Sequence, residues 1–194
     1  LHELRGEYPQ AFQWIERGLG ALAGRASAEI AHLLLLAGLI NIRQGDYDAA
    51  LQQCQAALRI AESLNDVRAL ARANNLLGIT YLRGNSAAAI EHFERALDLY
   101  QRAGDLQGQA MAHNLSANAR FNMGRWKEAD HHYRRAREAF DKMGDVYNRV
   151  MADNNLGGIA LNQGRLDEAL AFYQEALRAL EQIGGSAYVL GVIH

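Results

Sequence analysis

Residues 74–104 read NNLLGITYLRGNSAAAIEHFERALDLYQRAG and contain two helix-like segments joined by a Gly-Asn turn. Apolar and small residues recur every three or four positions on both sides of the turn, which is the spacing of one face of an α-helix. Gly and Asn in succession favour a turn because both tolerate left-handed backbone conformations. The stretch therefore predicts a hairpin of two antiparallel helices.

The same hairpin recurs along the chain. Turn-like pairs begin at Gly6, Gly45, Gly84, Gly124 and Gly164, at intervals of 39, 39, 40 and 40 residues. A second series of turns lies between them, at residues whose side-chain oxygen is suited to capping a helix start. Three of these caps follow a residue suited to a left-handed helix end. The caps are Ser27, Asp66, Asp105 and Asp145, and the preceding residues are Asn65, Gly104 and Gly144.

These signals divide the chain into repeats of 39 or 40 residues. Even spacing of this kind predicts a stack of similar hairpins. The chain does not begin with Met, and its first residues precede a turn directly, so we expect a piece of a longer protein. We expect residues 1–194 to form a single all-α solenoid fragment, with the second helix of a partial repeat at 7–24, full helix pairs at 27–64, 66–103, 105–143 and 145–183, and the start of a further repeat at 186–194.

Small residues mark the positions where helices are expected to approach closely. In each second helix a small residue is followed four positions later by a larger one and then by another small one, as in Ala89, Phe93 and Ala96. Gly inside a helix destabilises it by about 1 kcal/mol relative to Ala, so packing must compensate. We predict that the larger residue fills the space beside the small residue of the paired helix. The matching first-helix positions are Gly38, Gly78, Ala117 and Gly157.

The spacing Leu77-Gly78-x-x-Tyr81, followed by Ala89 and Phe93, resembles the tetratricopeptide repeat, and the resemblance covers almost the whole chain. The family's first-helix Trp and terminal Pro are absent, and the unit exceeds the usual length of about 34 residues. Longer units of this kind resemble those of kinesin light chains, of polarity adaptors and of bacterial regulators related to the maltose activator. The resemblance implies a right-handed superhelical solenoid whose first helices line a concave groove.

Three asparagines occupy one register position of the first helices. Asn75, Asn114 and Asn154 each stand three residues before the close-contact position. An Asn amide both donates and accepts, so it suits the main chain of an extended peptide. In similar peptide-binding repeats an Asn in this region holds the ligand main chain. We therefore expect these side chains to be exposed in the groove, with bonding to neighbouring helices or water as the alternative.

Other residues on the same face suggest a polarity of the groove. Arginine pairs well with carboxylates, so we expect a peptide or protein ligand with an acidic segment at the arginine end and a neutral or apolar segment at the other. A solvated charged face is the alternative. The arginines are Arg43, Arg72 and Arg83, and the neutral residues are Met111, Asn118, Asn122, Met151 and Asn162.

Composition narrows the range of partners and compartments. The formal net charge of -2 gives no basic excess, so we do not expect direct binding to nucleic acid. The longest apolar stretch, at residues 33–42, is too short to span a bilayer. The single cysteine cannot form an intramolecular disulfide, which fits a reducing compartment. We expect a cytoplasmic protein without a membrane partner.

No pattern in the sequence points to an enzyme, a cofactor or a metal site. His131 and His132 are adjacent, so on a helix they point about 100° apart, and neither has a Cys or second His three or four positions away. No Gly-rich phosphate loop occurs. The repeat register places Cys54 in the core, and we expect Trp14 and Trp126 to pack near turns.

Two classes of function follow. The leading one is a protein–protein interaction module that binds a peptide or partner segment in its groove, as part of a larger signalling or regulatory protein. The alternative is a sensor arm that binds a small effector or its own output domain, such as an ATPase, a cyclase or a transcription regulator. Self-association through exposed terminal helices is a third reading.

Overall fold

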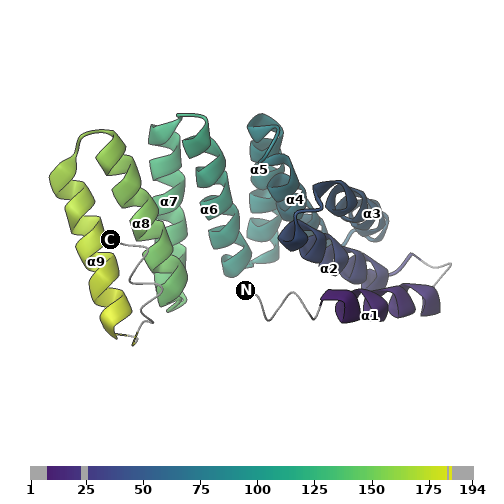
Figure 1. Cartoon of the computed structure of the whole chain (residues 1–194). Coiled ribbons are helices and arrows are strands. Elements are labelled where there is room, and N and C mark those ends of the chain that lie inside the picture. The colour runs from purple at the N-terminus through teal and green to yellow at the C-terminus, as the bar shows by residue number, and fades with distance from the viewer. Residues whose placement is uncertain (1–7, 23–25, 183, 185–194) are drawn as a thin grey trace. The chain divides into compact units, whose positions relative to one another are not determined.

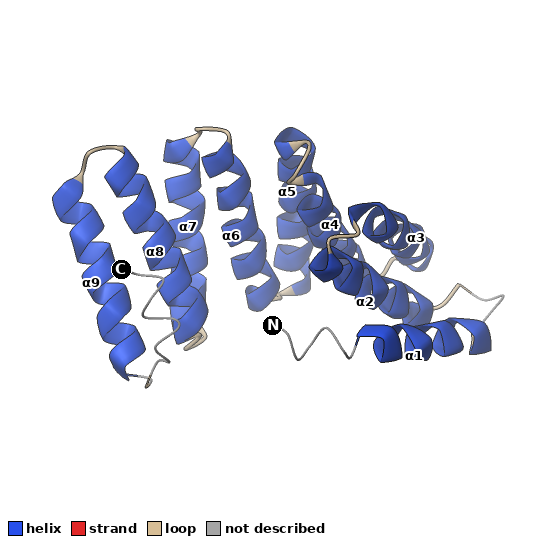
Figure 2. Cartoon of the chain, in the orientation of Figure 1, coloured by secondary structure: helices blue, strands red, loops and turns tan. Residues whose placement is uncertain are grey.

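The computed structural model describes residues 8–22, 26–182 and 184, which form nine helices and no strand (Figures 1 and 2). This confirms the prediction of an all-α fold built from antiparallel helix pairs. The chain divides into two compact units, Leu1–Gly104 and Asp105–His194, which we call unit 1 and unit 2. A single continuous solenoid over 1–194 stays a prediction.

Unit 1 contains a first helix followed by two stacked helix pairs. The first helix packs on the second through Ile15, Ala37 and Ile40. The helices are α1 (Tyr8–Ala21), α2 (Ala28–Gln44), α3 (Tyr47–Leu64), α4 (Val67–Tyr81) and α5 (Ser86–Ala103). Helix α2 pairs with α3 and α4 pairs with α5, while α4 also contacts both α2 and α3. Each helix pair therefore buries its apolar face against the next pair.

Unit 2 contains two further pairs. These are α6 (Leu106–Asn122) with α7 (Trp126–Lys142), and α8 (Val146–Asn162) with α9 (Leu166–Gln182). Helix α7 also contacts α8. Part of the core joins both pairs, because buried Tyr133 on α7 packs with Leu156 and Ile159 on α8. The further repeat expected at 186–194 lies outside the described residues.

The predicted helix caps are present. Each cap side chain accepts a hydrogen bond from a backbone N–H in the first turn of its helix, and these residues are Ser27, Asp66, Asp105 and Asp145. Asn65, Gly104 and Gly144 have φ angles of 53°, 66° and 68°, as expected for left-handed helix ends. Gly84 differs, because its φ is not positive. Helix α4 is 15 residues long, whereas α2, α6 and α8 have 17.

The close-contact prediction is also confirmed. A Cβ atom added to Gly38 would lie 2.6 Å from the Sγ atom of Cys54, and one added to Gly157 would lie 2.6 Å from Cε1 of Tyr173. Phe93 fills the same space beside Gly78. Cys54 is fully buried, and burial raises the pKa of its thiol to about 12, so it is a neutral core residue.

The prediction for the tryptophans is wrong. Trp14 is 69% exposed, with the guanidinium of Arg17 5.3 Å from its ring centre, because no described helix covers that side of α1. Trp126 is the first residue of α7 and is also exposed. Separately, none of the described helices is long and apolar enough to cross a membrane.

Candidate functional site

The three register asparagines lie on α4, α6 and α8, and the fold leaves their side chains unbonded. Asn75, Asn114 and Asn154 form no side-chain hydrogen bond with any described residue. In Asn75 and Asn114 the Oδ1 atom is buried and has no partner in that part of the chain. A buried acceptor without a partner costs about 1–3 kcal/mol, so a donor supplied from outside would be stabilising.

The expectation that these asparagines are exposed is wrong for Asn75, which is 8% exposed. The reason is that α4 has helices on three sides, namely α2, α3 and α5. Asn114 and Asn154 are half-buried. Rotation of an amide by half a turn exchanges its oxygen and nitrogen, so a ligand is able to meet either group.

Other asparagines have used their hydrogen-bonding groups within the fold. Asn118 accepts a hydrogen bond from the Tyr133 hydroxyl. The amide of Asn162 donates to the carbonyl oxygen of Gly158 on its own helix, at 2.9 Å. Asn122 is exposed at the end of α6. Among the predicted groove residues, Asn118 and Asn162 thus have partners that the register asparagines lack.

Unit 1 contains a cavity of about 520 Å³ between the first turns of α2 and α4. Its walls combine apolar Leu33 and Leu35 with the cationic side chain of Arg72, which lies 3.3 Å from Nδ1 of His32. We call it the α2–α4 groove. The lining is Ala28, Glu29, His32, Leu33, Leu35, Asp66, Arg68, Ala69 and Arg72.

The predicted arginines do not gather at one place. Only Arg72 lines the α2–α4 groove, and Arg68, which the sequence reasoning missed, joins it there. Arg83 instead lies over the Tyr47 ring, 5.1 Å from its centre. Arg43 is exposed in the last turn of α2. The sequence contains a signal for Arg68, because this residue lies in the first turn of α4, two residues after the cap Asp66.

The predicted neutral face belongs to unit 2. Met111 on α6 is 41% exposed, and Met151 on α8 is half-buried. Each stands three residues before a register asparagine, one helical turn away on the same side of the helix. This side of unit 2 therefore combines the thioethers of the two methionines with the amides of the two asparagines, and none of these four side chains is charged.

A histidine pair was missed by the sequence reasoning. Nδ1 of His113 on α6 lies 3.0 Å from Nδ1 of His132 on α7. Burial and nearby positive groups, Arg120 among them, lower the pKa of both imidazoles to about 4. The contact joins two helices, so the spacing of histidines along one helix does not predict it. Within the described residues no three His, Cys, Asp or Glu side chains are placed to hold a metal ion.

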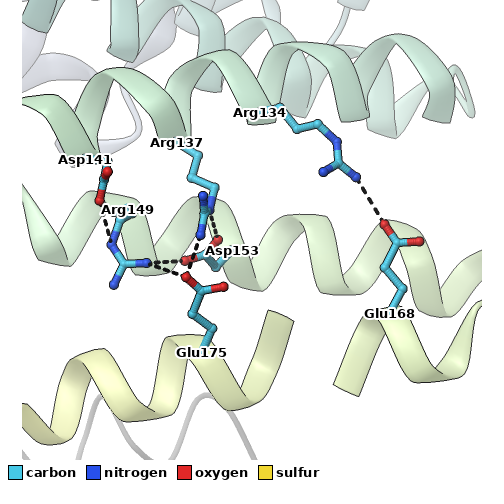
Figure 3. A network of polar contacts seen from close by, with 7 residues as sticks. All are labelled: Arg134, Arg137, Asp141, Arg149, Asp153, Glu168 and Glu175. Carbon is cyan, nitrogen blue, oxygen red and sulfur yellow. Dashed lines mark hydrogen bonds and ion pairs between the residues drawn. The ribbon is translucent and has the colours of Figure 1, made fainter. Parts of the chain in front are cut away.

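Unit 2 also contains a network of ion pairs across three helices (Figure 3). The fully buried Asp153 on α8 accepts hydrogen bonds from Nε of Arg137 on α7 and, at 3.0 Å, from Nη1 of Arg149. Both arginines also reach Glu175 on α9, at 2.7 and 3.5 Å. Burial raises the pKa of the Asp153 carboxyl, and the two guanidinium groups oppose that shift. The network joins the two helix pairs of unit 2.

Comparison with known proteins identifies the class. The sequence matches the tetratricopeptide repeat family over residues 29–102 and 108–182. The chain therefore belongs to the tetratricopeptide repeat family. No curated protein matches the sequence well enough to serve as a relative.

Several solved structures share the fold. BtubC (BKLC) from P. vanneervenii is 22% identical with a TM-score of 0.78, over 92% of this chain and 74% of that one. A Rap protein complexed with competence and sporulation factor is 17% identical with a TM-score of 0.78, over 91% of this chain and 52% of that one. The Rap conjugation gene regulator of the plasmid pLS20, in complex with the Phr* peptide, is 20% identical with a TM-score of 0.63, over 76% and 42%. The chain spans about half the length of these Rap structures or less.

Proposed function

We propose that the chain is a protein-interaction module that binds a peptide or partner segment on the face of its first helices that carries the register asparagines. The observation that carries the proposal is the set of three asparagines at one register position, Asn75, Asn114 and Asn154, whose side chains bond no described residue. Asn is a mediocre helix former. Asn occurs at the same position of three first helices without a hydrogen-bond partner among the described residues, which favours a role in binding a ligand.

The chemistry suits a main chain. An Asn amide donates to a peptide carbonyl and accepts from a peptide N–H, so one side chain satisfies both groups of an extended segment. The structures of the two Rap proteins, one in complex with the Phr* peptide, support a peptide ligand for this fold. Met111 and Met151 would contact apolar side chains of the segment, since thioethers adapt to irregular shapes.

We place an acidic part of the ligand at the α2–α4 groove of unit 1. Arg68, Arg72 and His32 line it together with Glu29 and Asp66. The Asp66 carboxylate is already used, because Oδ1 accepts from the backbone N–H groups of Arg68 and Ala69. The guanidinium of Arg72 has the imidazole of His32 beside it, and a ligand carboxylate would give it a stronger hydrogen bond.

A peptide selected from a display library against the whole chain provides the probe for the test. Its affinity is measured by fluorescence anisotropy for the parent chain and for the N75A/N114A/N154A variant, whose helicity is checked by circular dichroism. Each lost hydrogen bond is worth about 0.5–1.5 kcal/mol, so for three of them we expect roughly 10- to 1,000-fold weaker binding.

Asn155→Ala is the matched control, because Asn155 is half-buried on the same helix as Asn154 and points about 100° away. We expect this control to keep the parent affinity. Equal affinity of the parent and the triple variant would contradict the proposal. Acidic and neutral peptides that bind equally well would contradict only the placement of the acidic segment.

A second candidate function is a sensor arm that binds a small effector. The volume of the α2–α4 groove, about 520 Å³, favours it, because small-molecule sites commonly measure about 300–1,000 Å³. Hydrogen exchange separates the two. A small effector would slow exchange only at the first turns of α2 and α4, whereas a peptide held by the asparagines would also slow it in α6 and α8.

A further inference from the structure

Unit 1 has a second groove, of about 630 Å³, on a different side of its helices. Helices α3, α4 and α5 line it, so we call it the α3–α5 groove. None of the register asparagines or predicted groove arginines belongs to its lining. That lining is Leu58, Glu62, Leu70, Asn74, Glu91, Glu94, Arg95, Asp98 and Leu99.

The α3–α5 groove combines apolar and acidic residues. One leucine comes from each helix, namely Leu58, Leu70 and Leu99. Four carboxylates and a single arginine give the lining a formal charge of −3. Glu62 and Glu91 form no ion pair with any described residue. Asn74 is already bonded, to the carbonyl oxygen of Leu70 and to His92.

The positions that line the α3–α5 groove have equivalents in unit 2, where side chains of the chain itself occupy the corresponding space. Leu58 and Leu70 correspond to Arg137 and Arg149, each 79 residues later. Positions on α5 correspond to residues 80 later on α9, because the turn between α4 and α5 is one residue shorter. Asn74 corresponds to the buried Asp153, Glu62 to Asp141, and Arg95 to Glu175.

In unit 2 these positions form the network of Figure 3. The guanidinium groups of Arg137 and Arg149 lie among Asp141, Asp153 and Glu175, each bonded to at least two carboxylates. The position between two consecutive helix pairs therefore accepts guanidinium groups when acids surround it. In unit 1 the two arginines are replaced by leucines, and of the three acidic positions only Glu62 stays acidic, because Asn74 and Arg95 stand at the other two. The remaining carboxylates of the lining, Glu91, Glu94 and Asp98, stand at positions that are not acidic in unit 2.

We propose that the α3–α5 groove binds a partner segment that inserts an arginine side chain flanked by apolar residues. The partner's guanidinium would lie beside Leu58 and Leu70, the positions of Arg137 and Arg149 in unit 2, and would pair with Glu62 and Glu91 instead of the acids of that network. Its methylene stem and apolar neighbours would pack on the leucines, as long cationic side chains do on apolar surfaces. Arginine fits better than lysine, because its planar fork bonds two carboxylates at once.

The test uses the whole chain and two fluorescein-labelled peptides of about twelve residues. In the first peptide, arginine and leucine take turns at every third or fourth position, so that they line one face of a helix. In the second peptide every arginine is replaced by glutamine. We expect the arginine peptide to bind at least about tenfold more tightly than the glutamine peptide in fluorescence anisotropy, with affinity falling as salt is added.

Two variants examine the groove itself. E62Q/E91Q removes the unpaired carboxylates and is expected to weaken the arginine peptide about fivefold. L58R/L70R installs the arginines of unit 2 and is expected to abolish binding, because the chain then fills its own groove. E16Q/E181Q is the control, with the same change in charge at two exposed positions outside the groove.

Equal binding of the two peptides, no binding of either, or equal weakening by E62Q/E91Q and E16Q/E181Q would overturn the proposal. So would unchanged binding by L58R/L70R. The N75A/N114A/N154A variant is expected to bind the arginine peptide like the parent. Failure of the proposed peptide-binding face and failure of this groove are therefore separate outcomes.

Discussion

Replacing Gly157 with alanine is expected to destabilise the chain, although alanine is the better helix former. The added Cβ would lie 2.6, 2.9 and 3.0 Å from Cε1, Cζ and Cδ1 of the Tyr173 ring. Carbon atoms prefer a separation of about 3.5–4.0 Å, so the ring or the helix must move. Overpacking of this kind costs about 1–3 kcal/mol, and helix propensity returns about 1 kcal/mol. We expect a net loss of about 1 kcal/mol in the free energy of unfolding.

Gly158→Ala is the matched control in the same helix. A Cβ at Gly158 meets only the Tyr173 hydroxyl oxygen, at 4.0 Å. This variant is therefore expected to stabilise the chain by about 1 kcal/mol, so the two variants differ by about 2 kcal/mol. Urea unfolding followed by circular dichroism measures both. If Gly157→Ala stabilised as much as Gly158→Ala, the close-contact reasoning would be refuted. Adding Tyr173→Leu to Gly157→Ala is expected to recover part of the loss, as non-additivity between touching residues requires.

Three further predictions concern buried groups. Asp153→Asn is expected to lower the free energy of unfolding by about 1–3 kcal/mol in urea melts, because it removes the buried carboxylate that pairs with Arg137 and Arg149 and leaves them only their other acidic partners. Arg134→Ala at an exposed pair is expected to cost less than about 1 kcal/mol. The pKa values of His113 and His132 are about 4 in the folded chain, below the unfolded value. Their contribution to stability is thus complete above about pH 6.5 and lost as the pH falls toward 4, and His132→Phe is expected to flatten that part of the profile. The Cys54 thiol, with its pKa raised to about 12, is expected to react slowly with a disulfide reagent until urea unfolds the chain, and fast labelling of the native chain would contradict its burial.

Most of the fold follows from the sequence because the signals of a repeat reinforce one another. The caps Asp66 and Asp105 and the left-handed Asn65 and Gly104 are local features, so they appear in the sequence at the positions where the backbone uses them. Tertiary placement is harder to predict. Trp14 is apolar but exposed, because its burial depends on a neighbour and not on its own helix.

The candidate site was predicted less completely, for a physical reason. Register fixes which residues share a helix face, and it placed Asn75, Asn114 and Asn154 at equivalent positions. It does not fix how deep a position lies, so the burial of Asn75 was missed. Long side chains add a second difficulty, since Arg83 turns toward Tyr47 and Arg72 toward the α2–α4 groove.

Comparing equivalent positions between repeats recovers part of this missing information. Where the scaffold requires one chemistry, the positions agree, as in the glycines that accommodate Cys54, Phe93 or Tyr173. Where contact chemistry is free to differ, they diverge, as between Leu58 and Leu70 in unit 1 and the arginines of unit 2. A buried ion-pair network and an open acidic groove are then two solutions at one place in the repeat. The first satisfies its charges within the chain, and the second leaves the exposed Glu62 and Glu91 without an ion pair among the described residues. Divergence at this repeated position is thus the observation on which the proposed arginine-binding groove rests.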